Sequence, residues 1–355
     1  MFTEAIENIL ADQCTPAAIR TIEGGGSPTA LWNALAEAGF LELMTPEAKG
    51  GASLALDALF PICVAFGRHA VPVPAAQSIA ARALLDGCAT PPAGMITLSG
   101  AGRREENGTL GAPLTAFGML ADFALVNLDG DMLLLDCAKA ERIGTGVHHS
   151  LCATLRWPKA ALPAPLARRG EQVRRFSAAI HAAAIAGAME WMFGKTLEYC
   201  NDRAQFGKAI GKFQAVQHQL SVMAEQVAVA GISAELAFSG GFAGTPDGTF
   251  TGAANIPALL PAAIAKARAS MAVSLVAATA HALHGAIGVT EEFDLQLYSR
   301  RLHEWRMAEG SETYWNGIVG EAVLAQAPAT VSPVASTIDF VRAALNHQPA
   351  QEQAQ

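Results

Sequence analysis

Residues 203–218 read RAQFGKAIGKFQAVQH. This glycine-containing stretch separates two segments, at about 171–201 and 212–238, that are rich in small and branched apolar residues and contain no proline. A third apolar segment covers about 253–284. Each segment is longer than most helices of globular proteins. Together they predict antiparallel members of a bundle of long helices.

The chain ahead of this bundle changes character. Three short apolar runs bounded by turn residues, at 95–99, 123–128 and 132–137, predict β-strands. The Asp129-Gly130 pair favours a tight hairpin between the last two, because both residues tolerate positive φ angles. Within residues 1–90, apolar residues recur at helical spacing in four segments, which are 4–11, 28–38, 54–66 and 75–85.

These patterns predict a mostly α protein of the α+β class, in which a β module lies between two helical blocks. The expected parts are an N-terminal helical domain at 1–94, a small β domain at 95–165, a C-terminal helical bundle at 166–346 and a polar tail at 347–355.

Composition narrows the class of function. With 24 basic and 32 acidic residues, the formal net charge of −8 argues against a nucleic-acid partner. A hydrophobic content of 51% favours a folded chain over a disordered one. The window 269–289 has no charged residue and is long enough to cross a membrane. Its alanines, serines and two histidines favour a buried bundle helix instead, so we expect no membrane span.

Cysteine and histidine usage predicts neither disulfides nor a metal site. The N-terminus lacks the basic and then apolar pattern of a signal peptide. The six cysteines include no CxxC pair, so we expect unpaired thiols in a cytoplasmic protein. His281 and His284 lie three residues apart, but no further ligand stands at metal-binding spacing. The chain also lacks a P-loop and a Rossmann glycine motif.

Three short stretches have features that a plain helical bundle does not require. In 203–218, Arg203 would complement the helix dipole, but that role does not explain Phe206 in a polar turn. The stretch 284–292 (HGAIGVTEE) can end a helix, and its two glycines also permit a close backbone approach. The stretch 309–313 (EGSET) can begin a helix with a serine cap.

Together these stretches resemble the acyl-CoA dehydrogenase family. The resemblance extends to 31–40 (LWNALAEAGF), 45–47 (TPE) and Gly50-Gly51, and it covers about residues 28–325. It implies two helical domains flanking a small β domain, and FAD-dependent α,β-dehydrogenation of acyl-CoA thioesters. It also implies electron-transfer flavoprotein or a similar acceptor, and a homo- or hetero-oligomer, either a dimer or a tetramer.

The resemblance also implies roles for single residues. Glu309 would remove the α-proton while the flavin takes the β-hydride. The family's other position for this base falls near Ser177, where the chain has no carboxylate. Arg203 would pair with the FAD pyrophosphate, since a planar guanidinium suits phosphate oxygens, and Phe206 would pack on the cofactor. The other residues carried over to the cofactor site are Gln205, Gln214, Gly285, Ala286, Gly288, Ser311 and Thr313.

The chain departs from the family pattern in its β domain. The loop after Ile96 is short and lacks the family's acidic and Ser-Asp positions, and no Trp-x-Thr motif lies near 114–117. These departures resemble a branch whose short subunits share FAD sites in heteromeric enzymes acting on bulky or steroid-type acyl-CoA. Two hypotheses follow from the resemblance. The chain is a base-carrying dehydrogenase subunit, or it is a catalytically silent partner that completes the FAD site of a homologous chain.

Overall fold

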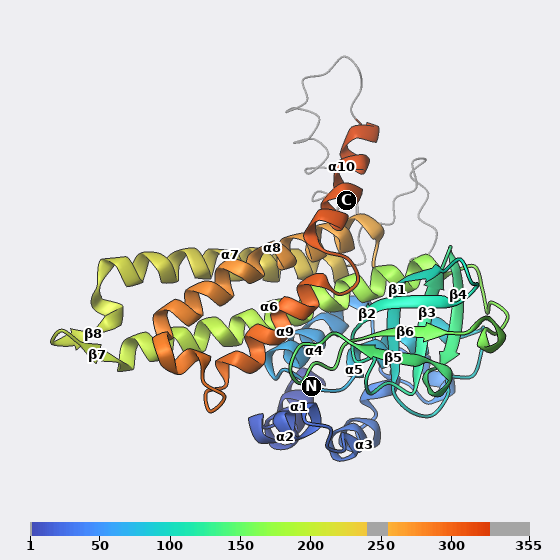
Figure 1. The fold of residues 1–355 in the computed structure, drawn as a ribbon, viewed down its shortest axis with the longest axis horizontal. Helices are drawn as coiled ribbons and strands as arrows, with labels where there is room; N and C mark the ends of the chain where they lie inside the picture. Colours follow the sequence, from blue (N-terminus) through green and yellow to red (C-terminus); the bar gives the residue numbers. More distant parts are fainter. Residues whose placement is uncertain (1, 240–254, 327–355) are drawn as a thin grey trace, which may run out of the picture.

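Helices form the N-terminal part of the computed structural model, which describes residues 2–239 and 255–326 (Figure 1). Four of them occupy the segments predicted from apolar spacing. The helix at 16–23 was not predicted, although the Thr15 side chain caps it and Pro16 begins it. The elements are α1 (Phe2–Gln13), α2 (Pro16–Glu23), α3 (Thr29–Glu37), the short turns η1 (Phe40–Glu42) and η2 (Glu47–Lys49), α4 (Leu56–Arg68) and α5 (Ala75–Leu85).

A six-stranded sheet follows, in the spatial order β4-β3-β1-β2-β6-β5. Its strands are β1 (Ile96–Arg104), β2 (Leu110–Thr115), β3 (Phe123–Leu128), β4 (Asp131–Asp136), β5 (Glu141–Gly144) and β6 (Ala153–Trp157). Asp129 and Gly130 both have positive φ between β3 and β4, which confirms the predicted hairpin. β1 pairs in parallel with β3, and its register shifts between Ser99 and Gly102. The shift leaves Gly100 outside the ladder.

Long helices form the C-terminal part. They are α6 (Gly170–Asp202), α7 (Gln214–Phe238) and α8 (Leu259–His284), followed by α9 (Leu295–Met307) and α10 (Glu312–Gln326). α8 begins later than predicted, because the residue before Pro257 is disfavoured in helical conformation and Ala258 is extended. The fold class is the predicted one, mostly α with a sheet between helical blocks. The predicted polar tail lies outside the described residues.

Two glycines bring α4 and α6 into backbone contact. A Cβ atom at Gly187 would lie 2.0 Å from the carbonyl oxygen of Val64, and one at Gly67 would lie 2.1 Å from that of Ala184. Both distances are far inside van der Waals contact, so neither position has room for a side chain. The crossing fixes α6, and every residue that α6 carries, against the N-terminal helices.

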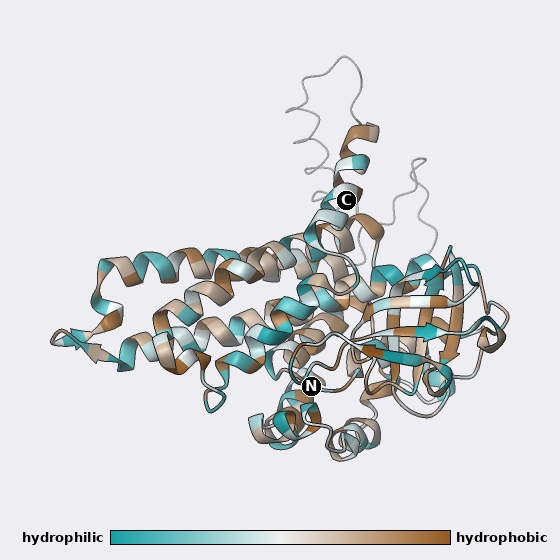
Figure 2. Ribbon diagram, viewed as in Figure 1, coloured by the Kyte–Doolittle hydropathy of each residue, from teal (hydrophilic) through white to brown (hydrophobic). Residues whose placement is uncertain are grey.

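Three helical segments are long and apolar enough, by length and composition, to cross a membrane: α6, α7 and Leu259–Val289. The share of the most apolar window that is buried within the chain is 83% for α6 but only 33% for α7 and 39% for the third segment. Figure 2 shows apolar residues along these helices. α6 is therefore a core helix, whereas α7 and α8 keep large surfaces available for another molecule.

The α4–α6 crossing can be tested with a pair of glycine substitutions on one helix. We expect Gly187→Ala to destabilise the protein by ~1–3 kcal/mol, because the new methyl group overpacks the contact. Gly194→Ala on the exposed side of α6 is the control, since nothing lies within 4 Å of its Cβ position. It should be neutral or stabilising by up to ~1 kcal/mol. Urea unfolding measures both, and equal stabilities would contradict the packing argument.

Candidate active site

Glu309 is a buried carboxylate in the turn between α9 and α10. Only 4% of its surface is exposed. Its φ is +58°, in the left-handed region, and Gly310 follows at +101°. A non-glycine residue held there costs of order 1–3 kcal/mol, and such strain persists only where the surroundings fix it. Trp315 helps to fix the turn, because its indole N–H donates to the Glu309 carbonyl oxygen at 3.0 Å.

Lys266 of α8 also holds this turn through hydrogen bonds. Its side chain is fully buried. Its Nζ donates to the carbonyl oxygens of Arg306 at 2.9 Å and Gly310 at 3.0 Å, and to Ser270 Oγ at 3.0 Å. These bonds use all three ammonium protons. Sequence analysis missed Lys266, although a lysine inside an otherwise apolar helix was a usable signal.

Burial brings the pKa values of Glu309 and Lys266 close to neutrality. Burial raises the pKa of Glu309 to about 7, against the opposing effects of the Gly100 N–H and the Lys266 charge. Burial lowers the pKa of Lys266 to about 7, while the negative charges of Glu309 and Glu312 raise it. A carboxylate with this pKa can accept a proton at physiological pH and release it again.

One oxygen of Glu309 is bonded and the other is free. Its Oε2 accepts the N–H of Gly100, one of the two residues that the β1 register shift leaves without a partner in β3, at 2.5 Å. Its Oε1 is buried and has no partner among the described residues. Ser99 Oγ beside Gly100 and Ser177 Oγ on α6 are likewise buried and unpartnered within the described part of the chain. The free Oε1 of Glu309 can therefore accept a bond from a polar ligand.

A second set of predicted residues lies on a small hairpin of β7 (Ala204–Gln205) and β8 (Lys208–Ala209). Phe206 and Gly207 form its turn with φ values of +53° and +82°. Asn or Asp is usual at the first position of such a turn, so phenylalanine is strained there. The Phe206 side chain is nevertheless 91% exposed. Arg203, Gln205 and Gln214 are exposed around it, and Arg203 forms no ion pair with any described residue.

The glycine turn at the end of α8 lies at the same end of the bundle. It forms η6 (Gly285–Val289), and His284 before it stacks on Tyr199, one turn from the hairpin. Gly285 has a positive φ of 64° with open space around its Cβ position, and Ala286 beside it is exposed. Gly288 is buried, and a Cβ there would lie 2.9 Å from His284 Cβ.

The predicted site residues therefore form two groups at opposite ends of α6. Glu309, Ser311 and Thr313 lie near the β sheet, whereas Arg203 through Gln214 and Gly285 through Gly288 lie at the far end (Figure 1). α6 has 33 residues and is about 50 Å long. One chain therefore cannot bring both groups to one cofactor. The exposed Arg203 and the aromatic ring beside it fit the phosphate and ring parts of FAD.

Comparison with protein families covers both helical parts of the chain. Residues 1–89 match the N-terminal domain of acyl-CoA dehydrogenase, and residues 174–324 match its C-terminal domain. The chain belongs to the acyl-CoA dehydrogenase family. It is thus an FAD-dependent oxidoreductase by family, as the sequence motifs predicted.

Similar proteins cover nearly the whole length of this family member. "Acyl-CoA dehydrogenase IpdE2" of Mycobacterium tuberculosis is 28% identical over 85% of this chain and 90% of its own. Among solved structures, the ChsE4-ChsE5 complex of Mycobacterium tuberculosis has a TM-score of 0.76 at 21% identity, covering 92% of this chain and 97% of the other. A variant of the Tcur3481-Tcur3483 steroid ACAD has a TM-score of 0.75 at 24% identity, covering 91% and 96%. The two structures share the fold.

The raised pKa of Glu309 predicts how stability depends on pH. Folded Glu309 keeps its proton up to about pH 7, whereas the ordinary value is 4.5. The folded state therefore binds more protons in this window, and stability falls as pH rises through it. Glu309→Gln cannot titrate, so it should gain on the wild type by roughly 2 kcal/mol between about pH 5 and about pH 8.

Lys266 changes the stability difference in the same direction. In Glu309→Gln the Lys266 pKa is lower still, because the negative charge that raises it is gone. The variant therefore loses most stability at low pH, where Lys266 is charged. Urea unfolding of both proteins across this pH range measures the difference. Parallel stability curves would contradict the assignment of a raised pKa to Glu309.

Proposed function

We propose that this chain is the base-carrying subunit of a heteromeric acyl-CoA dehydrogenase that acts on bulky, steroid-type acyl-CoA thioesters. The observation that carries the proposal is Glu309, a strained, buried carboxylate with a pKa of about 7 and one free oxygen. The name of the Tcur3481-Tcur3483 steroid ACAD and the ChsE4-ChsE5 complex support the substrate class and the mixed assembly.

Glu309 would take the α-proton of the thioester on Oε1, while Oε2 stays bonded to the Gly100 N–H. The positive charge of Lys266 stabilises the carboxylate before the transfer, and burial favours the neutral acid after it. Bound FAD supplies the acceptor for the β-hydride. Electron-transfer flavoprotein or a similar acceptor would then reoxidise the flavin.

All six cysteine thiols of the chain are free, which suits an enzyme of the cytoplasm.

The second subunit would complete the cofactor site. The Phe206 ring is exposed in a strained turn, and Arg203 near it forms no ion pair with a described residue. Both features support docking of this hairpin on FAD that a neighbouring chain mainly holds. The large exposed apolar surfaces of α7 and α8 support an interface along the bundle. One packing arrangement would cover both features.

A different observation favours the silent-partner alternative. The Gly100 N–H donates directly to the Glu309 carboxylate, so β1 lies against this side chain. The strand would then occupy space that a substrate needs beside Glu309. In that case the homologous chain would hold the working base, and this chain would contribute Arg203 and Phe206 alone.

Replacing the base separates these two functions. In the complex purified with its partner chain, Glu309→Gln should retain FAD and lose flavin reduction by acyl-CoA by about 10²–10⁴-fold, because the amide cannot accept the proton. Anaerobic stopped-flow absorbance of the flavin measures the rate. Glu321→Gln, an exposed change on α10, is the control and should reduce at the wild-type rate. Unchanged reduction in Glu309→Gln would assign the base to the partner.

The hairpin can be tested without damaging its fold. Phe206→Asn places the favoured Asn-Gly pair in the turn, so the chain should fold at least as well. We expect weaker association and lower FAD occupancy, because the exposed ring is gone.

Arg203→Ala should lower FAD affinity by roughly one to two decades through loss of a charged hydrogen bond. Sedimentation and flavin absorbance measure both, and wild-type assembly with full FAD in both variants would refute the shared site.

A further inference from the structure

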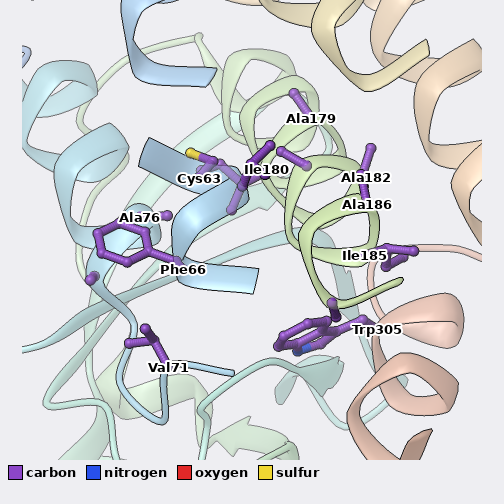
Figure 3. Close-up of a cluster of buried hydrophobic side chains, with 14 of the residues drawn as sticks. Cys63, Phe66, Val71, Ala76, Ala179, Ile180, Ala182, Ile185, Ala186 and Trp305 are labelled. Atoms are coloured by element: carbon purple, nitrogen blue, oxygen red, sulfur yellow. The ribbon is translucent and has the colours of Figure 1, made fainter. Parts of the chain in front are cut away.

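A small cavity lies inside the chain where α4, α5, α6 and α9 meet. Figure 3 shows side chains of all four helices around this region, among them Phe66, Ala76, Ile180 and Trp305. The free volume is about 20 Å³, which is room for one oxygen-sized group. The wall is mostly apolar. Its polar side chains are Gln77 and His181, and Cys63 adds a weakly polar thiol.

His181 lines this cavity and has one ring nitrogen without a hydrogen-bond donor among the described residues. It is only 2% exposed, and its Nδ1 lies 2.7 Å from the carbonyl oxygen of Ser177. A carbonyl can only accept, so Nδ1 carries the ring proton. Burial lowers the pKa of His181 to about 4, and the Lys266 charge adds to this effect, so the ring is neutral at physiological pH. Nε2 is therefore unprotonated, and no described residue donates to it.

The chemistry of the wall defines what can satisfy Nε2. An unmet buried acceptor is costly, so the cavity favours an occupant with a donor. A ketone oxygen has no donor, and an ammonium would lose its hydration in an apolar wall. An uncharged hydroxyl has a donor for Nε2 and an oxygen for the Gln77 amide, which makes no hydrogen bond with the described residues.

The cavity and the Glu309 carboxylate lie along the same face of α6. Trp305, in its wall, precedes Glu309 by about one helical turn. On α6, Arg174 lies against Gly100 beside the Glu309 carboxylate, and His181 follows about 10 Å further along the helix. A cyclic acyl group with its α-carbon at Glu309 would extend its far side towards His181.

We propose that His181 selects acyl-CoA thioesters whose ring carries a hydroxyl group, which donates to Nε2. This inference rests on the proposed acyl-CoA dehydrogenase function and names a feature of its substrate. His181 is then a specificity-determining residue, separate from the base.

The test uses three sets of probes on the FAD-loaded complex of this chain with its partner. They are cyclohexylpropanoyl-CoA, its hydroxycyclohexyl isomers with the hydroxyl at each ring position, and the matching ketones. Glu309→Gln in the complex prevents turnover, so calorimetry gives affinities. We expect one hydroxyl isomer to bind about tenfold more tightly than its ketone and the unsubstituted ring.

His181→Leu, of similar volume, should remove this preference while leaving the affinity for cyclohexylpropanoyl-CoA nearly unchanged. His303→Leu, an exposed histidine on α9, is the control and should keep it. The preference is measured in protein that retains His181, so a poorly folding variant does not prevent the test. Equal affinities of all probes would mean that the cavity holds water only, and the inference fails while acyl-CoA binding stands. Binding of no probe would overturn the proposed function as well.

Discussion

Helix α6 runs without a break from Gly170 beside the β sheet to Asp202 beside the β7–β8 hairpin. Its small residues allow close packing on several sides, and at Gly187 the backbone of α4 touches it directly. This rigid length separates the buried Glu309 carboxylate from the exposed hairpin by far more than a cofactor can span. The proposed cofactor site therefore needs a second chain, because one chain cannot bring both groups to one FAD.

Buried charges in this protein differ in how completely they are bonded. Both oxygens of Glu23 are used by Arg300 and Arg301, at 2.9 Å each, so this cluster has a structural role in tying α9 to α2. One oxygen of Glu309 instead has no partner among the described residues. Lys266, whose charge acts on Glu309, donates its protons to backbone and hydroxyl oxygens. Buried groups left in this state cost stability, and they are typical of sites that move protons.

The sequence predicted the long helices and the β3–β4 hairpin, because their signals are local. It did not predict β2, which contains Pro113, the short edge strand β5 or β6, since pairing across the sheet decides those. It predicted Glu309 and Arg203 through family motifs, and their roles stay predictions. Lys266 and His181 were missed because apolar residues surround each of them in the sequence, which therefore does not show whether their side chains point into the core.

Strain marks both ends of the molecule. Phe206 and Glu309 adopt left-handed backbone conformations that glycine or asparagine would occupy more easily. Trp315 and Lys266 hold the Glu309 turn through backbone hydrogen bonds, and the Phe206 ring packs edge-on against Phe213. The Phe206 ring contacts solvent, and the Glu309 carboxylate loses hydration on burial. We expect contacts with a partner chain, cofactor or substrate to stabilise both conformations further. Stability should therefore be coupled to assembly, because whatever binds the strained native state shifts its equilibrium with the unfolded chain.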